Sequence, residues 1–300
     1  MSEPTWSTVS FVKDTPENVR RFVSYHLGLG ARRMQIFFDD PLDPCIEMLA
    51  GLEQVTTVAC SPEFWLEHLG SSEIALHGVR QNTATTLGYA RATEDWVLNL
   101  DADEFLHLGA VPVTTFLSEV PPGVNVIRFR PAESVFVDDP QGREHFRLPI
   151  DRKSVTEVHG DFGVNTKRRL GFFGHLDGKS LIRSGLEGVR LRQHWPEDES
   201  RQVLLDLDFQ ALPDMCILHQ NAETFEMWRG KLDFRLSTNS IPGMLRGVLR
   251  SLLVEGDEAG IRDVYDKIFS LSEDALSKMQ DRNLLFALER PLNRFEASYF

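Results

Sequence analysis

The first hundred residues alternate short apolar runs with segments whose apolar residues recur every three or four positions. Short continuous apolar runs are typical of buried strands, whereas the three-to-four spacing predicts amphipathic helices. This pattern predicts strands at residues 6–12, 34–38, 55–59 and 96–100. It predicts helices between them, at residues 16–29, 45–52 and 72–91. Because strands that alternate with helices favour a parallel sheet with helices on both faces, we expect an α/β fold.

The pattern changes after residue 111. One more strand is predicted at residues 124–129, and residues 131–178 are rich in Gly, Asp and Arg, as in a loop-and-hairpin region. From about residue 224 the periodicity becomes helical, with predicted helices at residues 241–253, 259–270 and 272–287. We therefore divide the chain into an α/β domain at residues 1–235 and a C-terminal helical extension at residues 236–300.

An apolar stripe runs along the first helix of this extension. It is formed by Leu245, Leu249, Leu252 and Leu253. A helix that exposed such a stripe to water would aggregate or dimerise, so the stripe needs a partner surface. We expect it to pack on the α/β domain or to form a homodimer through the C-terminal helices.

The composition excludes several classes of protein. With 42% hydrophobic and 26% charged residues, the chain is typical of globular proteins rather than disordered ones. Its formal net charge of −13 repels a nucleic-acid backbone, so we expect no nucleic-acid partner. Cys45, Cys60 and Cys216 are far apart, which indicates neither a zinc ribbon nor a disulfide framework and fits a reducing compartment. No stretch approaches the ~18 apolar residues of a membrane helix, so we expect a soluble, cytoplasmic protein without a transmembrane segment.

The most informative segment is EDWVLNLDADEFL at residues 94–106, where a buried strand runs directly into Asp101, Asp103 and Glu104. In an open α/β sheet, ligands bind at the carboxyl ends of the strands. Side chains two apart on an extended chain point the same way, so Asp101 and Asp103 can converge on one ion or one ribose-diphosphate. Carboxylate oxygens suit Mg²⁺ or Mn²⁺, which commonly bridge to substrate phosphates. The alternative is a solvated acidic turn, which the mutual repulsion of three acids disfavours.

Four blocks of sequence, taken in order, resemble family 2-like glycosyltransferases of the GT-A fold. The first is VSFVKDTPENVRRFVSYHLGLGARRMQIFFDDPLD at residues 9–43, and the second is the EDWVLNLDADEFL segment. The third is GKSLIR at residues 178–183, and the fourth is HQNAETFEMWRGK at residues 219–231. GxSxG, GxxxxGK[ST] and GxGxxG motifs are absent from the sequence, which argues against a serine hydrolase, a P-loop enzyme and a dinucleotide dehydrogenase.

The chain also departs from the family pattern. Asp14 and Thr15 stand where the family tends to show Asn-Glu, Leu42 replaces a turn serine, and Gln220 replaces a tyrosine. The metal block is intact, whereas the loop that faces the nucleotide is altered. The donor base and sugar are therefore left open.

The resemblance implies a Rossmann-like GT-A fold and a metal-dependent, hexosyltransferase-type enzyme. Such an enzyme moves a sugar from a nucleotide-sugar donor to a glycan, lipid-linked or small hydroxyl acceptor, with inversion, as in polysaccharide biosynthesis. Mn²⁺ or Mg²⁺ neutralises the charge on the departing nucleoside diphosphate. Two alternatives stay open: a non-catalytic glycan- or nucleotide-binding module on the same fold, and a metal-dependent phosphoester hydrolase.

The implied site residues have three roles. The expected metal ligands are Asp101, Asp103 and His219, with Asp103 as the direct ligand and His194 as the rival of His219. The expected donor-binding residues are Lys13, Asp14, Asp39, Asp101, Lys179 and Arg183. An inverting transfer also needs a carboxylate that deprotonates the acceptor hydroxyl. The candidates for this base are Glu133, Asp138 and Asp139, expected in the loop after the strand at residues 124–129.

Overall fold

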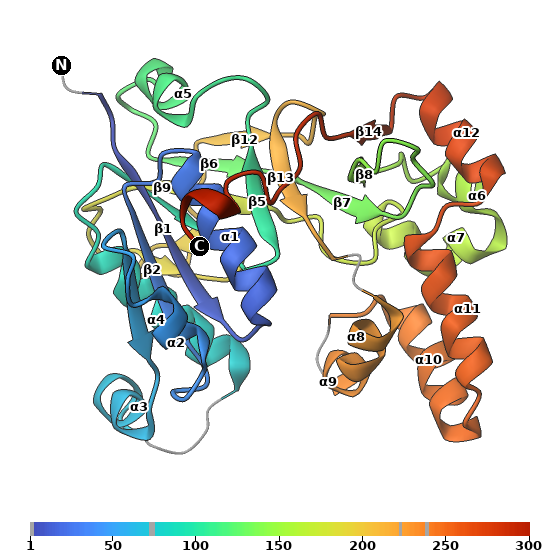
Figure 1. Ribbon diagram of the computed structural model, residues 1–300, viewed down its shortest axis with the longest axis horizontal. Coiled ribbons are helices and arrows are strands. Elements are labelled where there is room, and N and C mark those ends of the chain that lie inside the picture. Colours follow the sequence, from blue (N-terminus) through green and yellow to red (C-terminus); the bar gives the residue numbers. More distant parts are fainter. Residues whose placement is uncertain (1–2, 72–75, 222–223, 238–239) are drawn as a thin grey trace.

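The computed structural model describes residues 3–71, 76–221, 224–237 and 240–300. Two lobes lie side by side along the longest axis of the molecule (Figure 1). The first contains most of the N-terminal half of the chain, and the second contains most of the C-terminal helices (Figure 1). Within the part of the chain that is described, no helix is both long enough and apolar enough to cross a membrane.

A seven-stranded sheet forms the centre of the first lobe, in the order β12-β6-β9-β4-β1-β2-β3. Its strands are β1 (Trp6–Val12), β2 (Arg33–Phe38), β3 (Val55–Ala59), β4 (Trp96–Asn99), β6 (Val126–Phe129), β9 (Lys179–Arg183) and β12 (Leu207–Phe209). Neighbouring strands are parallel except at β9, which is antiparallel to both β4 and β6. The prediction of a mixed α/β fold around a mostly parallel sheet is confirmed.

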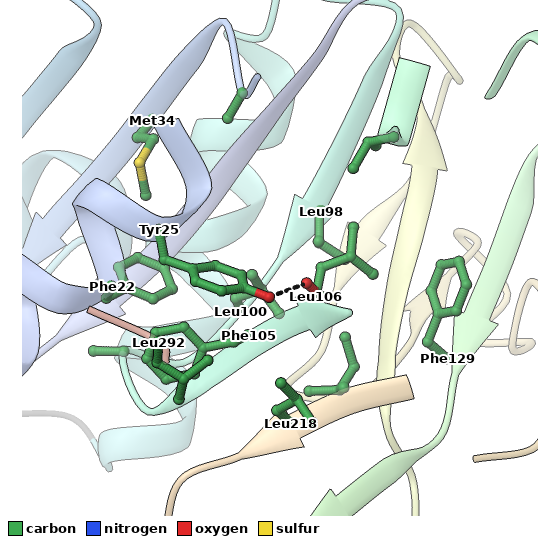
Figure 2. Close-up of a cluster of buried hydrophobic side chains, with 14 of the residues drawn as sticks. Phe22, Tyr25, Met34, Leu98, Leu100, Phe105, Leu106, Phe129, Leu218 and Leu292 are labelled. Atoms are coloured by element: carbon green, nitrogen blue, oxygen red, sulfur yellow. Dashed lines mark hydrogen bonds between the residues drawn. The ribbon is translucent and has the colours of Figure 1, made fainter. Parts of the chain in front are cut away.

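Helices cover both faces of this sheet. They are α1 (Pro16–Gly28), α2 (Cys45–Leu49), α3 (Pro62–Leu69), α4 (His77–Ala90) and, at one edge, α5 (Val113–Glu119). Because side chains alternate along a strand, the neighbours Phe37 and Phe38 enter different cores, one with α4 and one with α1. On the α1 side, Tyr25 packs against Phe105, and its hydroxyl donates to the carbonyl of Leu106 at 3.0 Å (Figure 2).

A second, five-stranded sheet links the two lobes, in the order β14-β8-β7-β13-β5. Its strands are β5 (Glu104–His107), β7 (Pro131–Val135), β8 (His145–Arg147), β13 (Cys216–His219) and β14 (Leu285–Ala287), and a small hairpin pairs β10 (Arg190–Leu191) with β11 (Pro196–Glu197). Strand β5 follows β4 after a turn and pairs antiparallel with β13, with His219 opposite Glu104. This pairing brings the acidic segment after β4 next to a histidine more than 100 residues later in the chain.

The second lobe is largely helical. Its helices are α6 (Val155–His159), α7 (Gly163–Thr166), α8 (Phe225–Gly230), α9 (Leu232–Ser237), α10 (Gly243–Glu255), α11 (Glu258–Phe269) and α12 (Glu273–Asp281), with single 3₁₀ turns at Gly160–Phe162 and Lys167–Arg169. A third 3₁₀ turn, Glu296–Ser298, lies beside α1 in the first lobe (Figure 1). The predicted stripe on α10 packs within the chain: Leu245 and Leu249 are fully buried in a cluster with Trp228 and Phe269. Leu252 and Leu253 are partly buried against the same cluster.

The C-terminal segment differs from the prediction of a separate helical extension. The helix expected at residues 272–287 ends at Asp281, and Leu285–Ala287 forms β14 instead. Asn283 has a left-handed φ of 55°, which turns the chain back toward β8 between these two elements. Leu292 is then fully buried in the core beside α1 (Figure 2). Residues 236–300 therefore complete both the second sheet and the core of the first lobe.

Candidate functional site

The sequence-predicted residues lie at a reversal of the strand order in the main sheet. From β1 the chain builds outward to β2 and β3, then returns to place β4 on the other side of β1. In open α/β sheets, ligands bind at the carboxyl ends of the strands at such a point. Lys13 and Asp14 follow β1 there, and Asp101 and Asp103 follow β4.

Asp101 and Glu104 share one buried cation, the ammonium group of Lys179. The Nζ atom of Lys179 donates to Oδ2 of Asp101 at 2.7 Å and lies 3.0 Å from Oε2 of Glu104. It also donates to the carbonyl of Gln193 at 2.9 Å. Burial works against the charged ammonium, but the two carboxylates outweigh that cost and hold the pKa of Lys179 above its usual range. This ion pair holds the start of β9, the strand of the third sequence block, against the acidic segment.

The turn after β4 separates the two aspartates. Ala102 and Asp103 form a turn rather than extended backbone, and the N–H of Asp101 donates to Oε2 of Glu104 at 2.9 Å. The alternation of an extended chain therefore does not apply, and Asp101 and Asp103 have different partners. Besides Lys179, Asp101 accepts a hydrogen bond at its Oδ1 atom from Nε2 of Gln81 at 2.6 Å.

Asp103 faces His219. Nε2 of His219 lies 3.5 Å from Oδ2 of Asp103, because the antiparallel pairing of β5 and β13 places His219 opposite the next residue, Glu104. Burial works against both charges, but each group favours ionisation of the other: the pKa of His219 rises to about 9, and that of Asp103 stays well below its usual range, with Lys231 contributing. About 30% of the Asp103 side chain remains exposed, so this pair is open to solvent and to a ligand.

Three imidazole rings lie side by side beside these acids. The ring of His175 lies 4.1 Å from that of His194 and 5.1 Å from that of His219, measured between centroids. Nε2 of His175 bonds to Oε1 of Glu104 at 3.0 Å, whereas Nδ1 of His194 bonds to the carbonyl of Gly178 at 3.3 Å. Burial, with His175 and Lys179 nearby, lowers the pKa of His194 to about 3. Of the two rival histidines, His219 is therefore the one that faces Asp103.

The residues after β1 and β2 lie at the same end of the sheet, and they differ in how firmly the protein already binds their side chains. Oδ1 of Asp14 lies 3.8 Å from Nζ of Lys231, and burial raises the pKa of Asp14 although that lysine opposes the shift. Asp39 accepts two hydrogen bonds from the guanidinium of Arg80, at 2.8 and 2.7 Å, so its carboxylate is already bound within the protein. Lys13 is exposed.

Arg183 does not lie near Asp101 and Asp103. Strand β9 is antiparallel to β4, so Lys179 at its first residue lies near Asp101, whereas Arg183 at its last residue pairs opposite Trp96. The guanidinium of Arg183 stacks on the Trp96 ring at 4.4 Å, at the other edge of the sheet. Four residues on a strand keep one face but span about 13 Å, which separates two side chains that a helix would bring together.

The three general-base candidates lie in different environments. Glu133 belongs to β7 rather than to a loop, and it is fully buried with its carboxylate in a salt bridge to Arg147 at 2.7 Å. Asp139 bonds to His145 at 2.7 Å, which holds the pKa of this carboxyl down, to about 2. Asp138 is exposed. Glu133 presents no oxygen to an acceptor, so the structure provides no route for it to act as the base.

Sequence reasoning missed two residues of the polar network, Gln81 and His175. Gln81 bonds to Asp101 and accepts from Nε2 of Gln193 at 2.7 Å, so it continues the network of Lys179. No local pattern marks either residue. The one available signal is their position, because Gln81 lies on the helix before the acidic strand and His175 lies just before the GKSLIR block.

Asp103 and His219 fit a divalent cation. A carboxylate oxygen and, once His219 has lost its proton, an imidazole nitrogen are ligands that Mn²⁺ accepts, and the solvent-exposed side of Asp103 leaves room for further ligands. Across the residues that the structure describes, no three His, Cys, Asp or Glu side chains form a ready-made metal site. An ion held here would therefore take its other ligands from water and substrate phosphates, as Mg²⁺ sites commonly do.

Comparisons with known proteins do not show a family for this chain. No protein-family model matches it, and a search among curated proteins finds no match. Among solved structures, HddC from Yersinia pseudotuberculosis is similar over 60% of this chain and 75% of its own, at 14% sequence identity and a TM-score of 0.28. Similarity this low carries no argument about function.

Proposed function

We propose that this protein is a metal-dependent glycosyltransferase with a GT-A fold, which transfers a sugar from a nucleotide-sugar donor to a hydroxyl acceptor. The observation that carries the proposal is the convergence of the four sequence blocks. Asp14 of the first block lies next to Lys231 of the fourth, and Asp103 of the second lies next to His219 of the fourth. Lys179 of the third block binds the second block.

The arrangement suits a diphosphate held by an ion. Asp103 and His219 would hold Mn²⁺ or Mg²⁺, which when bound supplies Lewis-acid stabilisation of the departing nucleoside diphosphate. The side chains of Lys231 and Lys13 reach solvent, where ammonium groups can donate to phosphate oxygens. An acidic protein needs such local cations to bind a doubly charged nucleotide sugar.

The remaining carboxylates have supporting roles. Asp101 is about one-third exposed, so a lone pair not used by Lys179 or Gln81 can accept from a ribose hydroxyl. Asp39 keeps Arg80 in place beside His77 at the end of β2. As the resemblance implies, the acceptor is a glycan, a lipid-linked sugar or a small alcohol. The transfer inverts the configuration of the anomeric carbon of the sugar.

The test is calorimetric titration of UDP- and GDP-sugars with Mn²⁺ present. We expect binding that Asp103→Asn weakens by at least about tenfold, because one ligand charge is lost while the shape is kept. Turnover on an acceptor panel should fall by orders of magnitude in the same variant. Glu53→Gln is the matched control, since this exposed acid precedes β3 at the opposite edge of the sheet.

Three outcomes would contradict the proposal. Failure of every nucleotide sugar to bind, with or without metal, would remove the donor site. Release of inorganic phosphate from phosphate esters without any acceptor would indicate a hydrolase instead. Binding with no transfer or donor hydrolysis across the panel would indicate a binding module.

A further inference from the structure

The ammonium of Lys179 uses all of its hydrogen-bonding capacity inside the protein. Its three donors are matched by three oxygens, from the carboxylates of Asp101 and Glu104 and the carbonyl of Gln193, at 2.7 to 3.0 Å. The side chain is 1% exposed, so it offers nothing to a substrate. A buried lysine in this state is a fixed positive charge rather than a ligand-binding group.

The two carboxylates around it are engaged as well. Oδ1 of Asp101 accepts from Gln81, and Oδ2 accepts from Lys179. Oε2 of Glu104 faces Lys179 and accepts the N–H of Asp101, while Oε1 bonds to His175. Of the three acids after β4, Asp101 and Glu104 are paired with the ammonium of Lys179, whereas Asp103 is paired with His219 and 30% of its side chain is exposed.

We propose that Lys179 is a built-in counter-ion that keeps Asp101 and Glu104 out of metal coordination and so limits the site to one divalent cation, bound by Asp103 and His219. Lys179 acts through the two acids and is a positioning residue for the metal site. The inference rests on the metal-binding part of the proposed function. Its physical basis is that a divalent cation and an ammonium group compete for the same carboxylates, because like charges repel.

Removal of the Lys179 ammonium would leave three oxygen atoms around an empty position. Three oxygens of three residues converge on the point that Nζ occupies, and oxygen ligands are what Mn²⁺ and Mg²⁺ prefer. Closing the shell around an ion requires each oxygen to move by less than about 1 Å, since Mg²⁺–oxygen distances are about 2.1 Å. The variant Lys179→Ala should therefore gain a second divalent site in place of the lost charge.

The experiment measures binding of Mn²⁺ alone to the full-length protein, by electron paramagnetic resonance of the free ion. Wild type is expected to bind one ion. Asp103→Asn should weaken this binding at least tenfold, whereas Asp101→Asn should change it less than threefold. Lys179→Ala should bind a second ion, and the double variant Glu104→Gln with Lys179→Ala should lose that gain because one of the two carboxylates is removed.

The outcomes separate this inference from the proposed function. Equal weakening by Asp101→Asn and Asp103→Asn would overturn the counter-ion role and leave a metal-dependent transferase intact. One ion bound by Lys179→Ala and none bound by wild type would support the counter-ion role and remove the metal from the proposed function. No ion in either protein would overturn both. Should Lys179→Ala fail to fold by circular dichroism, the comparison of the two aspartate variants decides.

Discussion

Replacing Glu133 by glutamine is expected to destabilise the protein by about 3–5 kcal/mol, although the change adds no bulk. Glu133 is fully buried at the centre of β7, and its salt bridge partner Arg147 is 2% exposed. Oε2 accepts from Nη2 and Nε of Arg147, at 2.7 and 3.2 Å, and from the N–H of Phe173 at 2.9 Å. Oε1 accepts from the N–H of Gly174 and from Nδ2 of Asn221.

The size of the expected loss of stability follows from the groups that the glutamine amide can no longer pair with. A glutamine in this place carries no charge, so the guanidinium of Arg147 becomes a buried charge without its counter-ion, a change that typically costs 3–5 kcal/mol. The new NH₂ group also points at one set of donors, either those of Arg147 and Phe173 or those of Gly174 and Asn221. Either orientation places donor against donor, which leaves polar groups unsatisfied.

Urea denaturation followed by circular dichroism measures the effect. We expect a lower midpoint for Glu133→Gln with an unchanged slope, which indicates a change in stability rather than in the surface exposed on unfolding. Glu258→Gln is the matched control, because Glu258 pairs with Arg229 at the surface and should leave the midpoint at its wild-type value. A loss below about 1 kcal/mol for Glu133→Gln would refute the argument, since it would mean that the Arg147 charge is relieved by water or by movement.

Two further predictions concern other buried groups. Burial lowers the pKa of His26 to about 4, whereas the same side chain in the unfolded protein has a pKa of about 6.5. As the pH falls, the unfolded protein therefore binds a proton at His26 before the folded protein does. The free energy of unfolding should drop by up to about 3 kcal/mol between pH 6.5 and 4. His26→Phe should flatten that part of the curve of unfolding free energy against pH, and an unchanged slope would contradict the assignment. Leu292→Ala should cost about 2–5 kcal/mol because the side chain is fully buried in the core, whereas Val254→Ala, at a 90% exposed position, should leave the thermal midpoint near wild type. Equal effects of these two substitutions would mean that the C-terminal residues do not complete the core.

Local patterns predicted the strands and helices of the first lobe up to β4, except for one helix. The strands at Trp6–Val12 and Val55–Ala59 and the start of the helix at Pro16 agree with prediction to the residue, because apolar runs and the Thr15 cap act within a few positions. The carboxyl ends of parallel strands then bring Asp14 and Asp103 to one edge of the sheet. A missed helix, Pro62–Leu69, carries its own signals: Ser61 caps its first turn and Gly70 ends it in a left-handed conformation.

The second sheet was not predictable in the same way. Its strands have three to five residues, too few for a periodic signal, and they pair with segments far along the chain. Leu285–Ala287 continues a helical apolar pattern in the sequence, yet pairing with β8 decides its conformation. The ion pair of Lys179 with Asp101 joins residues 78 positions apart, so no local pattern reveals that the first aspartate has a fixed cation.

The register between β5 and β13 decides which acid His219 faces. With His219 opposite Glu104, the imidazole reaches Asp103 across the end of the sheet. A shift of one residue would turn His219 to the other face of the strand, because side chains alternate with a period of two. The buried neighbours Ile217 and Leu218 oppose such a shift, since it would expose one of them and bury a polar group in its place. The apolar core under β13 therefore holds His219 beside Asp103, although the core residues themselves lie outside the proposed metal pair.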